Sequence, residues 1–177
     1  PATNVGTMAV VTAEALMAIA FGQLIREGAP MLFGVPAMTV ALNSGAPVHG
    51  SPDSAMVQFL AGQMARRYGI PHRAIANVAT SKTSDMQGAY DSMWGLFPSF
   101  LCGAQWITMA GGMMEGTLGV GYAKTLIDFE QLDAFYHFSQ GCYFDNLEEV
   151  FDTIRDVGPS GHFWARPRHK LQPFYFS

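Results

Sequence analysis

The sequence predicts an α/β fold in which short parallel strands alternate with helices. Segments with helical, strand and loop composition follow one another three times along the 177 residues. The strand segments are short and apolar on both faces, which is typical of buried parallel strands. Right-handed crossovers between such strands build either an open doubly wound sheet or a (β/α) barrel. A closed eight-stranded barrel needs about 250 residues, so this chain supplies only part of one.

The first half of the chain is expected to hold two helices and two strands. We predict helices over 8–25 and 51–68, strands over 31–33 and 73–78, and loops over 37–50 and 81–85. Ser51 is a typical N-cap, and Pro52 suits the first turn of the helix that follows. Gly69 is expected to end that helix. No G-x-G-x-x-G follows either strand, which disfavours a nucleotide-binding sheet.

The second half is expected to continue the alternation. We predict helices over 85–101, 126–139 and 147–157, a strand over 105–109 and a glycine-rich loop over 111–121. The 23 residues 92–114 carry no charge and are long enough to cross a membrane. They include Pro98, Gln105 and four glycines, so we expect a helix, a turn at Gly103 and a strand instead. Asp91, on that helix, is expected at the surface.

The composition limits the possible partners. Charged residues make up 14% of the chain, against roughly 25% in an ordinary soluble domain. Either other protein covers much of its surface, or the chain is a piece of a longer one. Because it begins with Pro1 and not with Met, we expect an internal fragment, a single region over 1–177 with an irregular aromatic tail over 162–177. The net charge of −4 with dispersed basic residues argues against nucleic acid. Since Cys102 and Cys142 suggest no disulfide framework, we expect a cytoplasmic protein, and the division of the 92–114 run into a helix and a strand argues against a membrane.

The cysteines and histidines give no metal site. Cys102 and Cys142 lack a CxxC partner, which predicts two reduced, buried thiols. No two of the five histidines are spaced like metal ligands. We therefore expect no directly bound metal.

Six segments carry a resemblance to a known family. They are 45–53, with GAPVHGSPD, then 63–69, 81–90, 110–116, with AGGMMEG, 122–130 and 157–162. In order and spacing they resemble the trimethylamine methyltransferase family of corrinoid-dependent enzymes. The chain looks like the branch without pyrrolysine. It departs from the family pattern at Thr80 and Met109, which bears on the substrate.

The resemblance implies a fold and an activity. The fold would be a (β/α)8 TIM-type barrel, with this chain as its C-terminal portion. The activity would move a methyl group from a quaternary or tertiary amine, such as a betaine, to Co(I) of a corrinoid (cobalamin) carried by a partner protein. The alternative is a degenerate barrel that binds a methylated amine without turnover. We also expect a homo-oligomer.

Candidate site residues follow from the loops at the C-terminal ends of the strands, where barrels carry their active sites. Glu115 stands in a glycine-rich stretch with no cation within eight positions, and it is one predicted catalytic residue. Asp85 is the other, with the alternative that it caps a helix. The predicted substrate-binding residues are Lys82, Gln87, Tyr90, Tyr122, His49 and His162.

A quaternary ammonium cannot donate a hydrogen bond, so aromatic faces and a nearby carboxylate should hold it. The carboxylate of a betaine would pair with Lys82 or His49. Met109, Met113 and Met114 flank Glu115. They would provide either core packing or an adaptable surface for a corrinoid.

Overall fold

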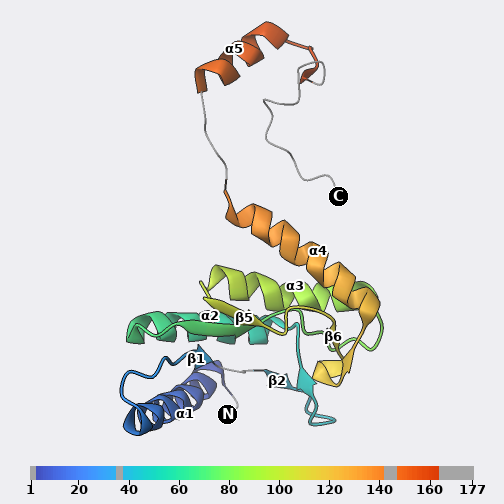
Figure 1. Cartoon of the computed structure of the whole chain (residues 1–177). Coiled ribbons are helices and arrows are strands. Elements are labelled where there is room, and N and C mark those ends of the chain that lie inside the picture. Colours follow the sequence, from blue (N-terminus) through green and yellow to red (C-terminus); the bar gives the residue numbers. More distant parts are fainter. Residues whose placement is uncertain (1–2, 35–37, 142–146, 164–177) are drawn as a thin grey trace. The chain divides into compact units, whose positions relative to one another are not determined.

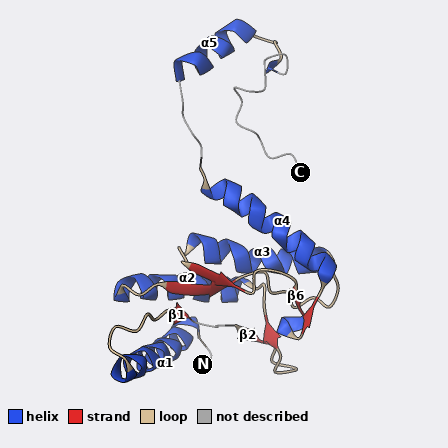
Figure 2. Cartoon of the chain, in the orientation of Figure 1, coloured by secondary structure: helices blue, strands red, loops and turns tan. Residues whose placement is uncertain are grey.

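The computed structural model describes residues 3–34, 38–141 and 147–163. Contacts divide the chain into two units, 1–132 and 133–177, and each is described by itself. The first unit is an α/β layer with a parallel sheet of order β1-β4-β5 (Figures 1 and 2). The strands are β1 (Phe33–Gly34), β4 (His72–Ile75) and β5 (Trp106–Thr108). The helices are α1 (Asn4–Ile25), α2 (Pro52–Tyr68) and α3 (Met86–Leu101). The predicted alternation of helices and parallel strands is confirmed, while closure of a barrel stays a prediction.

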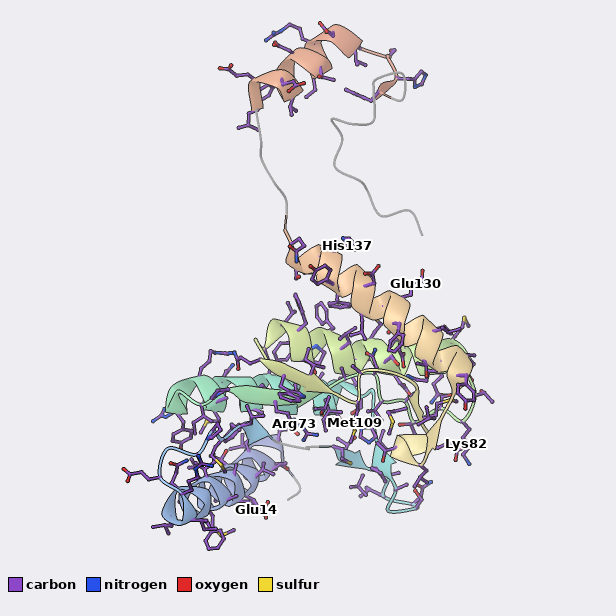
Figure 3. The ribbon with its side chains drawn as sticks, viewed as in Figure 1. Glu14, Arg73, Lys82, Met109, Glu130 and His137 are labelled. Atoms are coloured by element: carbon purple, nitrogen blue, oxygen red, sulfur yellow. The ribbon has the colours of Figure 1, made fainter. Side chains whose placement is uncertain are left out.

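One face of the sheet is covered by helices. Along β4, His72 and Ala74 are buried, whereas Arg73 and Ile75 are only half-buried. This alternation reflects the period of two in a strand. Both α2 and α3 pack against β4, and Figure 3 shows Arg73 on the side of the sheet away from α3. The helix-covered face is thus the core side of this unit.

The core joins α1, α2 and the first strand. Its buried residues are Met8, Phe33, Val57, Ala61 and Ala65. The α2 helix begins and ends as predicted, because the Ser51 side chain accepts a hydrogen bond from the Ser54 N–H and Gly69 closes the helix in a left-handed conformation.

Small residues let α3 approach the sheet closely. Gly88, Ser92, Gly95 and Ser99 recur at helical spacing, and a Cβ at Gly95 would lie 3.2 Å from the backbone nitrogen of Asn77. The Ser99 hydroxyl lies 2.9 Å from the carbonyl oxygen of Ile75, to which it donates. This tight packing places the start of α3 beside the loop that follows β4.

Two predicted loops contain short hairpins, so the irregular structure predicted for them was wrong in part. The first hairpin pairs β2 (Thr39–Val40) with β3 (Pro47–Val48). The second pairs β6 (Met113–Met114) with β7 (Gly119–Val120) and has a 3₁₀ turn, Glu115–Thr117, between them. Strands of two residues are too short to show the alternation by which strands are recognised.

The last two helices are α4 (Tyr122–Ser139) and α5 (Leu147–Val157). The α5 bounds match the prediction, whereas α4 begins four residues before the predicted start at 126. In the second unit, α5 exposes an apolar face made of Leu147, Val150, Phe151 and Ile154. Of the predicted tail over 162–177, residues 164–177 lie outside the described residues.

The uncharged run 92–114 forms no continuous helix. It divides into the end of α3, a turn at Gly103 and β5, as predicted. Within the described ranges, α1 is long and apolar enough to cross a membrane by length and composition, although Met8 on α1 belongs to the core. Cys102 is buried and free, as predicted, while Cys142 lies outside the described residues.

Candidate functional site

The loops that follow the three parallel strands meet at one end of the sheet. We call residues 38–51, 76–85 and 109–121 the C-terminal rim. Figure 1 shows the β2 and β6 hairpins at this end. The Glu115 N–H donates to the Ser81 carbonyl at 3.0 Å, and the Gly116 N–H donates to the Ala79 carbonyl at 3.0 Å. These bonds fasten the hairpin that carries Glu115 to the loop after β4.

The turn that holds Glu115 has an unusual backbone. Glu115, Gly116 and Thr117 have φ values of 49°, 63° and 84°, so three successive residues are left-handed. For a side chain other than glycine this conformation costs about 1 kcal/mol. A Cβ at Gly116 would lie 3.2 Å from the carbonyl oxygen of Pro47. The turn is therefore held by its neighbours, and it presents the Glu115 side chain to solvent.

Lys82 lies next to the same backbone junction. It follows Ser81, whose carbonyl accepts the Glu115 N–H, and Figure 3 shows Lys82 at the edge of the first unit. The side chains of Lys82 and Glu115 are exposed. In the part of the chain that the structure describes, neither side chain forms a hydrogen bond or an ion pair. Two opposite charges thus remain free on adjacent loops.

Asp85 acts as the N-cap of α3. Its carboxylate accepts hydrogen bonds from the Gly88 N–H at 2.9 Å, from the Ser81 hydroxyl at 2.9 Å and from the Thr83 hydroxyl at 2.7 Å. These donors, led by the Gly88 N–H, lower the pKa of the Asp85 carboxyl below its usual value. The capping alternative is confirmed, and a catalytic role for Asp85 stays a prediction.

His49, in the first loop of the rim, and Asp91, on α3, both bind Thr80. The Thr80 hydroxyl donates to the His49 carbonyl at 3.0 Å, and the Thr80 N–H donates to the Asp91 carboxylate at 2.9 Å. Asp91 is 6% exposed, so its predicted surface position was wrong. The reason is that the small-residue face of α3 turns Asp91 toward the loop after β4, where a backbone donor satisfies its charge.

The environment of His49 suits a neutral imidazole. Burial lowers the pKa of His49, and the nearby Asp91 carboxylate opposes that shift only in part. The imidazole Nε2 is buried without a hydrogen-bond partner in the described structure. His49 also lines a partly enclosed pocket of about 20 Å³ together with Ser54, Gln58 and Trp94, enough space for one water. Contact of His49 with a substrate stays a prediction.

A buried charge network joins α4 to α3 and to two loops of the rim. The Lys124 ammonium donates to the Asp128 carboxylate at 2.6 Å, to the Ser92 hydroxyl at 2.8 Å and to the Asn77 carbonyl at 2.8 Å. Asp128 also accepts from the Gly112 N–H at 2.7 Å and from the Ser92 hydroxyl at 3.0 Å. Lys124 and Asp128 are 2% and 0% exposed. We call these five residues the Lys124 network.

Lys124 and Asp128 were not among the residues predicted for the site. Their spacing of four places them on one helical face, but the predicted start of α4 at 126 left Lys124 in a loop. A helix start at Tyr122 would have shown the two residues as a helical ion pair, although not that the pair is buried.

The remaining candidates are exposed. Gln87 and Tyr90 lie on the first turns of α3, and Tyr90 packs edge-on against Trp94 with ring centroids 6.2 Å apart. Tyr122 begins α4 and is 92% exposed. His162 is exposed in the second unit. Their substrate contacts stay predictions. Among the described residues, no group of three or more potential ligands could hold a metal ion.

Comparison with known proteins gives one consistent family. A family model described as trimethylamine methyltransferase matches residues 1–175. A glycine betaine methyltransferase of Desulfitobacterium hafniense (strain Y51) is 34% identical over 99% of this chain and 37% of its own length. A trimethylamine methyltransferase of another strain of that species, DSM 10664 / DCB-2, is 31% identical over 91% of the chain and 32% of its own length.

A more distant relative carries a further name. The proline betaine:corrinoid methyltransferase of Eubacterium limosum is 24% identical over 92% of this chain and 34% of its own length. This chain thus spans about a third of the length of these relatives.

Proposed function

Because this chain belongs to the trimethylamine methyltransferase family, we propose that the complete protein transfers a methyl group from a methylated amine to the Co(I) of a corrinoid protein. In this proposal the first unit is part of a barrel, and its C-terminal rim surrounds the amine. The observation that carries the proposal is the pair of free opposite charges, Lys82 and Glu115, on adjacent loops of that rim.

The preferred substrate in this proposal is a quaternary amine with a carboxylate, that is, a betaine. Glu115 would attract the ammonium group, and Lys82 would bind the carboxylate. A quaternary amine leaves as a neutral tertiary amine and needs no proton, whereas a tertiary amine must first be made electrophilic. The 34% identical relative is named for glycine betaine, which supports this choice.

The reaction sets a limit on how Glu115 acts. The C–N bond breaks with its electron pair left on nitrogen, and Co(I) supplies the pair of the new bond to carbon. The positive charge on nitrogen therefore disappears as the methyl group leaves. A carboxylate in close contact with that charge would favour the bound substrate over the transition state. Glu115 should thus bind and orient the amine, with its carboxylate away from the methyl group that is transferred.

The corrinoid protein would approach the same rim. Met109 is 40% exposed and Met113 is half-buried, both within a few residues of Glu115. Methionine side chains are flexible and polarizable, which suits an adaptable surface for a large planar group. The corrinoid would be the methyl acceptor, carried by that partner protein.

The test uses the complete protein with a reduced corrinoid protein and three amines: a betaine, a quaternary amine without a carboxylate, and trimethylamine. Methylcorrinoid formation is followed by absorbance. We expect transfer from the betaine, with Glu115→Gln lowering kcat/KM for both quaternary amines by on the order of tenfold or more. Lys82→Met should lower it by about tenfold for the betaine alone, as expected for a lost charge-assisted contact.

The matched control is Glu14→Gln, which removes an exposed carboxylate on α1. It should leave every rate unchanged. Absence of methylcorrinoid with all three amines would refute the proposed function. Equal losses with Glu115→Gln and Glu14→Gln would remove Glu115 from the site.

A further inference from the structure

The Lys124 network is not explained by the stability of its own helix. Lys124 lies in the first turn of α4, where a cation opposes the helix dipole. A lysine four residues before an aspartate is also the weaker orientation of such a pair. Burial of both charges adds a desolvation cost that apolar side chains would avoid. The contacts that offset these costs are therefore the ones outside α4.

Those outside contacts join three segments that come from different parts of the fold. Asn77 follows β4, Ser92 lies on α3, and Gly112 follows β5. All three protons of the Lys124 ammonium have acceptors, and both Asp128 oxygens accept hydrogen bonds. The network thus fixes the ends of β4 and β5 relative to each other.

Gly112 links the network to Glu115. Its N–H is bound by Asp128, and its carbonyl accepts the Gly121 N–H at 2.9 Å. Both ends of the β6–β7 hairpin therefore meet at Gly112, and Glu115 follows it by three residues. Asn77 adds a second tie, because its side-chain amide donates to the Ala110 carbonyl at 2.8 Å.

We propose that Lys124 and Asp128 are positioning residues that hold the β6–β7 hairpin, and with it the Glu115 carboxylate, in place at the C-terminal rim. The importance of this role rests on the proposed function, since Glu115 acts on an amine only there. The left-handed turn at Glu115 is strained and needs such an anchor. Without the network the turn relaxes, and the carboxylate loses its fixed position.

The test variant is the double substitution Lys124→Met and Asp128→Leu in the complete protein. It leaves no unpaired buried charge, and neither new side chain can bind the Gly112 N–H. Hydrogen exchange of the peptide covering 110–121 should become at least about tenfold faster, while peptides from α1 and α2 keep their wild-type rates. The KM for the amine should rise on the order of 10- to 100-fold, with a smaller change in kcat.

Two further variants keep the test decisive. Ser92→Ala retains both charges and removes one hydroxyl, so it replaces the double variant if that variant does not fold. Hydrogen exchange over 110–121 should then become a few-fold faster than in the wild type. Glu130→Gln removes an exposed charge from α4 and should change neither exchange nor KM.

The outcomes separate this proposal from the proposed function. Wild-type exchange over 110–121 in the folded double variant would overturn the positioning role. Faster exchange with an unchanged KM would overturn it as well, since Glu115 would then need no anchor. If the wild-type protein transfers no methyl group, the proposed function fails. The affinity for a betaine, measured by calorimetry, is then compared between the wild type and the double variant in place of KM. Loss of binding together with faster exchange then supports the positioning role alone.

Discussion

Two pairs of opposite charges, one above the other, are used in opposite ways. Lys124 and Asp128, the lower pair, are buried and bind each other, two backbone groups and Ser92. Lys82 and Glu115, the upper pair, lie on the C-terminal rim, and their side chains are exposed and have no partner among the described residues. Buried charges need hydrogen-bond or ion-pair partners within the protein, whereas water solvates exposed charges, which therefore remain available to a ligand. In our proposal the lower pair therefore positions the rim, and the upper pair stays available to a ligand.

The largest effect should come from breaking the lower pair. Lys124→Met alone leaves the Asp128 carboxylate buried without its cation and should destabilise the protein by about 3–5 kcal/mol. Denaturant unfolding of the complete protein measures the loss. The upper-pair variant Lys82→Met is the control and should change stability by less than about 0.5 kcal/mol. Equal losses for the two variants would contradict the distinction between the pairs.

The second effect concerns the glycine that the lower pair binds. Gly112 has a φ of 76°, and an added Cβ would overlap the Thr125 hydroxyl oxygen. Gly112→Ala should cost about 1–3 kcal/mol of unfolding free energy. Gly119→Ala in the same hairpin is the matched control, because no atom lies within 4 Å of a Cβ there. A larger loss at Gly119 than at Gly112 would show that the hairpin is anchored elsewhere.

A third effect is a dependence of the protein's stability on pH through two buried histidines. Burial lowers the pKa values of His49 and His72, so below about pH 6.5 the unfolded chain binds protons that the folded chain does not. Stability should therefore fall as the pH drops through this range, by at most about 1.4 kcal/mol per histidine and pH unit.

Urea unfolding between pH 5 and 8 measures this slope. The double variant His49→Gln and His72→Gln should show a flatter profile below pH 6.5. The two profiles should run parallel between pH 7.5 and 8, where both states hold neutral histidines. A variant as steep as the wild type at low pH would contradict the assignment.

The sequence was sufficient to predict the α2 helix and the division of the 92–114 run, and it offered the cap at Asp85 as an alternative to a catalytic role. Each of these depends on local chemistry: a capping hydroxyl or carboxylate, a proline or a left-handed glycine. The position of Glu115 near Ser81 followed from the order of strands and loops, since parallel strands bring their C-terminal ends to one edge.

The features that could not be predicted depend on contacts distant in the sequence. Asp91 is buried because the Thr80 N–H from another segment satisfies its carboxylate. Lys124 is buried because acceptors on α3 and after β4 surround its ammonium. Neither residue differs locally from a surface charge, so only the packed structure identifies them.

The smallest effect should come from the upper pair itself. Glu115 has a φ of 49°, a conformation that glycine adopts without strain. Glu115→Gly removes that strain but adds freedom to the unfolded chain. The net change in unfolding free energy should lie within about 0.5 kcal/mol of zero and should be no less favourable than that of Glu115→Gln. A loss above about 1 kcal/mol would mean that the carboxylate stabilises the fold. In that case Glu115 would resemble Asp128 rather than Lys82, and it would not be free to bind an amine.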